Sequence, residues 1–559
     1  MNNIIIYITF ICFIVLLESI SGKNFNSDNV TITIDQGTLL GRKSLDFKNN
    51  TYYSFEGIPY AKTPKGTLRF KAPEPAEQWT GILNATNCTR ICPQQSYGDG
   101  VDCSDEDCLL LNIYSKMKSE LQPVMVYIHG GGFIFGGMNC NFKLSYGPQF
   151  FVQKDVVLVE IQYRLNIFGF LSLDDPKYGI SGNAGLKDQI MALKWIQKNI
   201  ADFAGDPNSV TIFGQSAGGS SVHLLYLSPL ANGLFHRAIA QSGAVTNPWV
   251  TSRYKTLELA DVLECSNKSI DELVNCINGT KMNHLLSRGL DRLRVKNSHA
   301  HPGNGKLVYF NILTIEQDNP ESFISQNPEY IVKKGEFNKV PIIMGFNSHE
   351  GYEFVHSNPV KANFTDAREL IPNDLKIDIN SNKAFKLGKR IQELYYGNLT
   401  PSYQNIDPFI HFLTDSLFVQ QIYNFAKLQA NKYEHVYFYH FDYWTDLNKQ
   451  DGYFNTSRIR KPVFHADDLG YMFYSSLKNY KQKDPNIAIG VHRMVKLWTT
   501  FAKTGNPNVQ NDPLLNVTWL PIQTNKFNYL HINLSLELKV NPIEERMKFW
   551  ENVYAEYNK

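Results

Sequence analysis

The chain has 559 residues, of which 43% are hydrophobic and 19% charged, a composition typical of a globular protein with a sizeable core. Its formal net charge is +2, from 55 basic and 53 acidic residues, so nothing points to nucleic acid or an anionic surface as a partner. The sequence contains no repeat, low-complexity tract or long linker, which favours one long domain.

The first predicted element is a signal peptide over residues 1–21. Its apolar run, Ile4 to Leu17, is shorter than a membrane span and fits a signal-peptide core, and Ser19 and Ser21 are small residues suited to cleavage. The alternative, an N-terminal anchor, is disfavoured by the shortness of the run. We therefore expect a secreted, extracellular protein without a membrane span, whose domain covers residues 22–559.

The cysteines and the glycosylation motifs also fit a secreted protein. Beyond Cys12 there are seven cysteines, whose spacing is unlike a zinc site, so we expect no metal and, in an oxidising compartment, disulfides with one thiol left over. N-x-S/T motifs predict a glycoprotein. The candidate asparagines are Asn29, Asn49, Asn84, Asn87, Asn267, Asn278, Asn363, Asn398, Asn455, Asn516 and Asn533.

Short, nearly continuous apolar runs predict buried parallel strands. A helix is predicted over 186–203, because apolar Ile190, Leu193, Ile196 and Ile200 follow one another at helical steps. Strands alternating with helices indicate a doubly wound α/β fold. Region 251–330 is less regular and predicts helices and loops inserted over one end of the sheet. The predicted strands are 124–130, 156–164, 209–214, 237–243, 340–346 and 435–441.

Two glycine-containing motifs follow predicted strands. Gly130, Gly131 and Gly132 end the first strand, and glycines let backbone N–H groups approach a substrate closely. Ser216 stands in GQSAG, between a strand and a helix-compatible run. The pentapeptide alone arises by chance about 0.2 times in such a chain, but strand–turn–helix is the context of a nucleophile elbow. We expect Ser216 to be a nucleophile, with the N–H of Ala217 as a further oxyanion donor.

A nucleophilic serine needs a base and a group that orients it. Glu350 is the predicted acid, since it lies just past a strand in a glycine-bounded loop; Asp467 and Asp468 are the alternatives, interpreted as acids at a helix start. His465 is the predicted base, because it stands in a polar loop after the last clear strand. The competing histidines His435 and His440 flank a strand, and His492 lies in a predicted helix.

The chain resembles the type-B carboxylesterase and cholinesterase family of α/β hydrolases over nearly all of the mature length. This resemblance implies a mostly parallel central sheet, covered by helices on both faces, with helical and loop insertions over the active site. The matching segments are FEGIPYAKTP, RFKAPEPAEQWTG, EDCLLLNIY, VYIHGGGF, YGPQFF, QYRLNIFGFLSL, GNAGLKDQIMALKWIQKNIADFAGDPNSVTIFGQSAGGSSVH, LFHRAIAQSG, GFNSHEG and HADDL.

The resemblance also implies residue roles and an activity. Ser216, His465 and Glu350 would form a catalytic triad that hydrolyses a small neutral ester through an acyl-enzyme, without cofactor. Gly131, Gly132 and Ala217 would form the oxyanion hole, and Ser242 would support the acid. The other implied pairs are the disulfides Cys92–Cys108 and Cys265–Cys276 and the buried ion pairs Arg69–Glu106 and Arg164–Asp188.

Three departures refine this expectation. Cys88 and Cys103 are additional to the family pattern and predict a third bridge, which would leave Cys140 free. Where cholinesterases place a tryptophan that binds choline by cation–π contact, this chain has Gly98. The residue before the nucleophile is the uncharged Gln215 rather than an acid. The absence of both choline-attracting groups predicts poor hydrolysis of choline esters.

The GQSAG form resembles insect juvenile hormone esterases, but those enzymes usually carry glycine where this chain has Pro462. We therefore interpret the chain as an insect-type carboxylesterase, with juvenile hormone esterase as the alternative. A non-catalytic, neuroligin-like binding protein is less favoured, since every triad and oxyanion position is filled and no predicted transmembrane segment follows the domain. Oligomeric state is not predicted.

Overall fold

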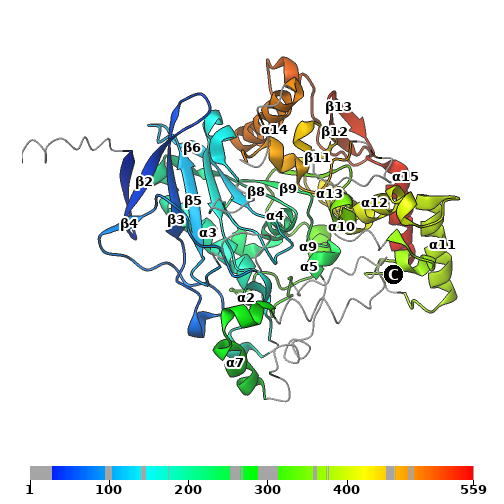
Figure 1. Ribbon diagram of the computed structural model, residues 1–559, viewed down its shortest axis with the longest axis horizontal. Coiled ribbons are helices and arrows are strands. Elements are labelled where there is room, and N and C mark those ends of the chain that lie inside the picture. The colour runs from blue at the N-terminus through cyan, green and yellow to red at the C-terminus, as the bar shows by residue number, and fades with distance from the viewer. Residues whose placement is uncertain are drawn as a thin grey trace, which may run out of the picture.

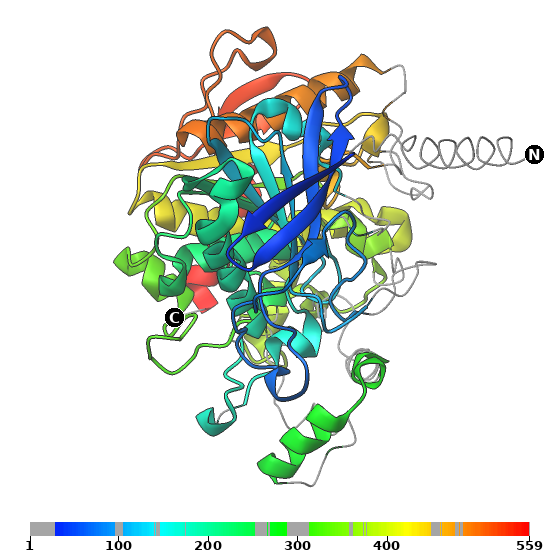
Figure 2. The same ribbon diagram turned by 90° about the vertical axis from the view of Figure 1, so that its left-hand side faces the viewer.

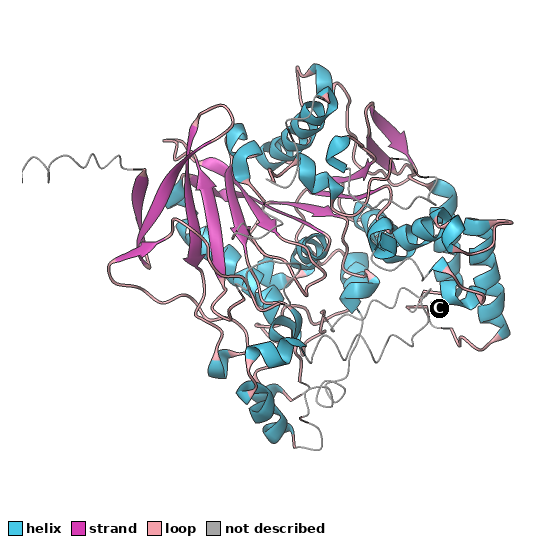
Figure 3. Ribbon diagram, in the orientation of Figure 1, coloured by secondary structure: helices cyan, strands magenta, loops and turns pink. Residues whose placement is uncertain are grey.

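A mixed sheet of 13 strands runs through the computed structural model, flanked by helices (Figure 3). The structure describes residues 28–94, 104–138, 140, 146–173, 175–251, 265, 269–287, 312–356, 362–372, 374–375, 377–448, 459, 461–475, 480 and 484–557. The predicted signal peptide lies outside these residues. In the described part, no helix is both long and apolar enough to cross a membrane.

The strands follow the spatial order β1-β2-β3-β5-β7-β6-β8-β9-β10-β11-β12-β13, and β4 pairs with β2. The seven strands from β7 to β12 in this order pair in parallel, whereas β1, β2, β3, β5 and β13 add antiparallel edges. The strands are β1 Asn29–Ile34, β2 Gly37–Leu45, β3 Thr51–Pro59, β4 Ile82–Asn84, β5 Leu110–Ser115, β6 Gln122–Ile128, β7 Val157–Ile161, β8 Gly205–Gln215, β9 Arg237–Gln241, β10 Ile342–Asn347, β11 Val436–Phe441, β12 Asn528–Ile532 and β13 Leu536–Val540.

Helices connect many of the strands. In Figure 1, α11, α12 and α15 lie at the right, whereas α14 lies at the top. Figures 1 and 2 both place α7 at the lower end of the molecule, away from the sheet. The α-helices in the described residues are α2 Asn166–Phe170, α3 Ala184–Asn199, α4 Ala217–Leu227, α5 Pro248–Thr251, α7 Ile270–Gly279, α9 Pro328–Lys334, α10 Tyr352–His356, α11 Asn382–Tyr396, α12 Asp407–Thr414, α13 Gln420–Ala430, α14 Pro485–Thr504 and α15 Glu544–Tyr557.

The alternation of side chains along the parallel strands builds two cores, one on each face of the sheet. In β6, Val124 and Val126 belong to the cluster that includes residues of α3 and α4. Met125 and Tyr127 belong to the other cluster, with Trp498 of α14. Because successive side chains of a strand point to opposite faces, a continuous apolar run serves both cores. The parallel strands and the helix over 184–199 confirm the α/β-hydrolase prediction.

The strand order reverses at β6, which lies between β7 and β8. In open α/β sheets, ligands bind beyond the carboxyl ends of the strands at such a reversal. The segments that follow β6 and β8 are the glycine loop and the GQSAG motif, so the topology brings these two motifs together.

The disulfides confirm two predicted pairs and correct the third. Cys92 is bonded to Cys108 and Cys265 to Cys276. The structure pairs Cys88 with Cys140, so the predicted Cys88–Cys103 bridge is wrong and Cys140 is not free. Spacing misled here because Cys88 and Cys140 are 52 residues apart in sequence, and only the fold brings them together. Cys103 lies outside the described residues.

Non-reducing peptide mapping is expected to recover a peptide that joins Cys88 to Cys140. Cys140→Ser should make Cys88 reactive to alkylation and lower the free energy of unfolding by about 2–5 kcal/mol, measured by denaturant unfolding, because the open chain gains conformational entropy. Cys103→Ser is the matched control and should leave both measurements unchanged. A recovered Cys88–Cys103 peptide would contradict this pairing.

Candidate active site

The GQSAG motif forms a tight turn between β8 and α4. Ser216 has φ 60° and ψ −122°, an unfavourable backbone conformation for a residue with a side chain. The neighbouring glycine allows it, since a Cβ on Gly218 would overlap the carbonyl oxygen of Ile128 at the end of β6. The turn therefore requires small residues beside the serine, as the motif predicts.

The glycine loop after β6 lies against this turn. A Cβ on Gly130 would come within 2.6 Å of the Gln215 carbonyl oxygen and 3.1 Å of the Ser216 Cβ. Gly131 and Gly132 have φ values of 107° and 61°, which favour glycine. Ala217 begins α4, and first-turn N–H groups have no acceptor within their own helix. The three predicted oxyanion donors thus lie on the two segments that flank Ser216.

His465 and Glu350 meet at the same edge of the sheet, although 115 residues separate them in sequence. The His465 Nδ1 atom lies 2.6 Å from Glu350 Oε2, and the Glu350 side chain is fully buried. The other Glu350 oxygen, Oε1, accepts the backbone N–H of Asn347 at 2.7 Å. An ionised carboxylate only accepts hydrogen bonds, so Nδ1 carries the proton and Nε2 of neutral His465 is free to act as a base.

The carboxylates around His465 raise its pKa. Burial lowers the pKa of His465, but the attraction and hydrogen bond of Glu350 outweigh it, so the pKa lies above the ordinary histidine value. Glu353 and Asp468 raise the same pKa further. A base with this pKa readily stores the proton that a serine releases during attack.

A buried polar network stands behind the acid, and the sequence did not reveal it. Asp468 accepts Gln241 Nε2 at 2.6 Å and Asn347 Nδ2 at 3.3 Å. Burial, followed by the charge of Glu350, raises the pKa of Asp468 to about 6. Ser242 was expected to support the acid, but its Oγ is buried without a hydrogen-bond partner among the described residues. The contact to Glu350 comes instead from the backbone N–H of Asn347.

Gln215 contacts the base directly. Its Nε2 lies 3.2 Å from His465 Nε2 and 3.5 Å from Nδ1, and the residue is buried. The sequence showed that Gln215 is uncharged but not what it contacts, because 250 residues separate it from His465.

An aromatic wall covers His465 on another side. The Phe418 ring lies 4.7 Å from the imidazole and 6.1 Å from the Trp249 ring, centroid to centroid. Phe418 belongs to a π-helical turn, Asp415–Val419, of the kind often found at functional sites. The carbonyl of Leu417 in this turn accepts Asn247 Nδ2 at 2.7 Å. The wall presents apolar surface beside the site, which suits a neutral ligand.

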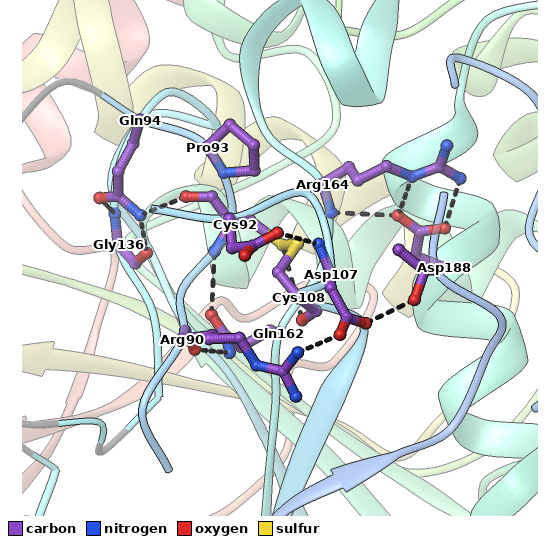
Figure 4. The surroundings of a disulfide bond; sticks show 12 residues. Arg90, Cys92, Pro93, Gln94, Asp107, Cys108, Gly136, Gln162, Arg164 and Asp188 are labelled. Carbon is purple, nitrogen blue, oxygen red and sulfur yellow. Dashed lines mark hydrogen bonds and ion pairs between the residues drawn. A yellow bond between two sulfur atoms is a disulfide. The ribbon is translucent and has the colours of Figure 1, made fainter. Parts of the chain in front are cut away.

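The loop closed by Cys92–Cys108 supports the glycine loop (Figure 4). Gln94 donates through Nε2 to the Gly136 carbonyl at 2.7 Å and accepts the Gly136 N–H through Oε1 at 2.8 Å. Figure 4 also shows the ion pair between Arg164 and Asp188, whose closest atoms are 2.6 Å apart. The pair Arg69–Glu106 forms as well, at 2.5 Å. Both ion pairs were predicted and are confirmed. The two hydrogen bonds between Gln94 and Gly136 were not predicted, because no local sequence pattern indicates them.

The competing residues lie elsewhere. His435 is paired with Glu434, His440 with Ser348, and His492 with Asp512. Asp467 and Asp468 begin a short 3-10 helix, as predicted, rather than binding His465.

The candidate glycosylation residues differ in their exposure to solvent. The candidate glycosylation residues Asn278 and Asn533 are half-buried, while Gly98, Asn267 and Asn455 lie outside the described residues. Within the described ranges no cluster of three His, Cys, Asp or Glu side chains fits a metal. The exposed candidates are Asn29, Asn49, Asn84, Asn87, Asn363, Asn398 and Asn516.

Known proteins share this arrangement. A model of the carboxylesterase family matches residues 28–550. The chain is 34% identical to juvenile hormone esterase of Tribolium castaneum over 567 residues, covering 92% of each chain. It is 33% identical to esterase FE4 of Myzus persicae over 522 residues, covering 89% of this chain and 88% of the other.

A solved structure agrees with the sequence relatives. The crystal structure of juvenile hormone esterase from Manduca sexta, with OTFP covalently attached, matches with a TM-score of 0.78 at 27% identity. The match covers 94% of this chain and 100% of that chain. The similarity therefore extends over the sheet, the glycine loop and the segments that carry Ser216, Glu350 and His465.

Proposed function

Because this chain belongs to the carboxylesterase family and is a carboxylic ester hydrolase, we propose that it acts through Ser216, His465 and Glu350. The observation that carries the proposal is the strained Ser216 turn at the sheet edge where His465 and Glu350 pair at 2.6 Å. The covalent attachment of OTFP in the Manduca sexta enzyme agrees with a nucleophilic mechanism.

The proposed reaction has two halves. His465 Nε2 takes the Ser216 proton, Oγ attacks the acyl carbonyl, and the oxyanion accepts the N–H groups of Gly131, Gly132 and Ala217. The alcohol leaves with the proton from His465. Water then attacks the acyl-enzyme by the same route and releases the acid. Glu350 holds Nδ1 and stabilises the imidazolium throughout.

Neutral esters are the proposed substrates. Gln215 places an amide rather than a carboxylate beside the nucleophile, and the nearby wall of Phe418 and Trp249 is aromatic and uncharged. We also propose that the protein is secreted, that residues 1–21 are its signal peptide and 22–559 its domain, and that its exposed N-x-S/T asparagines are glycosylated.

A kcat/KM panel tests the substrate class. Short naphthyl esters should exceed acetylthiocholine by at least about 10-fold, because a desolvated cation–π contact is worth about 2 kcal/mol and the expected platform is missing. Long-chain esters in the same panel report on acyl length. Acetylthiocholine turnover equal to that of naphthyl esters would contradict the assignment.

Juvenile hormone esterase is the second candidate function. It is favoured by the relatives from Tribolium castaneum and Manduca sexta, both named as juvenile hormone esterases. Juvenile hormone belongs in the same panel: a kcat/KM well above that of every simple ester favours this candidate, whereas a value below them favours a general carboxylesterase.

A further inference from the structure

Two loops bring the proposed acid and base together. Glu350 lies in the loop that follows β10, and His465 lies in the segment 461–468, after β11. Both residues stand in turns, outside the helices and strands. The 2.6 Å contact between Glu350 and His465 therefore depends on how these two loops are joined.

His349, the residue before Glu350, joins the loops through two reciprocal hydrogen bonds. Its backbone N–H donates to the Val463 carbonyl at 2.8 Å, and the Val463 N–H donates to His349 Nδ1 at 3.3 Å. A single hydrogen bond would let one loop pivot on the other, whereas two bonds to the same residue fix both distance and orientation. Val463 lies two residues before His465, so the two bonds act close to the base.

The side-chain bond supplies an acceptor that water cannot replace. Val463 is fully buried, and a buried N–H without an acceptor destabilises the fold. Burial lowers the pKa of His349 to about 4, while Asp442 and Asp407 raise this pKa and Arg546 lowers it further. At neutral pH the ring is therefore uncharged, and since Nδ1 accepts, its proton lies on Nε2. His349 thus contributes an acceptor and no charge.

We propose that His349 is a positioning residue for the reaction: by accepting the Val463 N–H, its imidazole holds the His465 loop at the distance at which His465 Nδ1 meets the Glu350 carboxylate. The inference rests on the proposed function. It assigns a role to a side chain that acts through Val463 rather than on the reacting atoms.

Other contacts between the two loops do not replace this one. Asn347 Nδ2 donates to the Phe464 carbonyl at 2.9 Å, and the rings of Tyr352 and Phe464 stack with centroids 5.6 Å apart. Both contacts act on Phe464, so neither supplies an acceptor for the buried Val463 N–H. Without the His349 acceptor, the segment at Val463 shifts toward another one, and His465 moves with it.

A second histidine makes the same pair of bonds away from the site. The His236 N–H donates to the Val210 carbonyl at 2.8 Å, and the Val210 N–H donates to His236 Nδ1 at 3.1 Å. Val210 is also fully buried. Ser216 follows the carboxyl end of β8, whereas His236 precedes the amino end of β9, which pairs with β8 in parallel. His236 therefore offers the same contact without a link to the proposed triad.

The test compares His349→Leu, His349→Asn and His236→Leu by steady-state kinetics with a neutral naphthyl ester, normalised to the sites that an organophosphate titrates. His349→Leu should lower kcat by roughly 10²-fold, as a misplaced catalytic group does, and leave KM within about two-fold, because His465 serves both halves of the reaction. His349→Asn should restore kcat to within a few-fold of wild type, since Oδ1 occupies the place of Nδ1 on Cγ. His236→Leu should keep the wild-type kcat, although both leucine variants lose thermal stability.

A wild-type kcat in His349→Leu would overturn the inference, as would equal losses of kcat in His349→Leu and His236→Leu, or His349→Asn no more active than His349→Leu. Should His349→Leu not fold, hydrogen exchange of the wild-type Val463 amide decides: slow exchange supports the bond, and exchange as fast as in an exposed loop overturns it.

Adding Ser216→Ala to each variant separates this inference from the proposed function. Activity that persists without Ser216 contradicts the proposed function itself. Activity that depends on Ser216 but is unchanged in His349→Leu contradicts only the role of His349.

Discussion

Replacing Ser216 by alanine is expected to lower the turnover of a neutral ester by about 10⁶-fold, as in serine hydrolases whose nucleophile is removed. Alanine retains the Cβ that the turn already accommodates at φ 60°, so the midpoint of thermal unfolding should stay unchanged. An organophosphate should add its mass to wild type at Ser216 and leave Ser216→Ala unlabelled, which intact-protein and peptide mass spectrometry would detect.

Ser119→Ala is the matched control, since this serine is exposed in the turn between β5 and β6, lies outside every N-x-S/T motif and should leave turnover and labelling at wild-type values. Near-wild-type hydrolysis by Ser216→Ala, or labelling at another residue, would refute the assignment of Ser216 as the nucleophile.

Glu350→Gln is expected to lower kcat by roughly 10⁴-fold, the loss seen when a triad carboxylate becomes an amide. The hydrogen bonds at Glu350 explain the size of this loss in kcat. Asn347 N–H donates to Oε1, so an introduced amide must keep its oxygen there and turn its NH₂ toward His465 Nδ1. His465 would then carry its proton on Nε2, where it cannot accept one from Ser216.

Steady-state kinetics with a naphthyl ester measure this loss, and thermal unfolding checks that the variant folds. Glu353→Gln is the matched control, because Glu353 is an exposed neighbour that raises the pKa of His465 through its charge. Its kcat should stay within a few-fold of wild type. A comparable loss in both variants would mean that total charge, rather than the Glu350 contact, governs the base.

Local patterns predicted the elements that carry the candidate site. Apolar runs marked β6, β8 and β10, and the residues just past these strands include the glycine loop, Ser216 and Glu350. Their positions just past strand ends were sufficient to predict that these residues share one site, since parallel strands bring their carboxyl ends to one edge of the sheet. The antiparallel edge strands β1 and β2 were not predicted, because half-exposed strands lack the continuous apolar run on which the prediction depended.

The sequence by itself determined the family resemblance, the parallel core of the sheet and the candidate triad, because these rest on local motifs and strand ends. The two disulfides Cys92–Cys108 and Cys265–Cys276 were implied by the resemblance. The tertiary structure alone decided that Cys88 pairs with Cys140, that Asn347 holds Glu350, and that Gln215 reaches His465. The physical reason lies in side-chain packing. Which buried groups meet depends on the path of the whole backbone, and no local spacing encodes a contact across 250 residues.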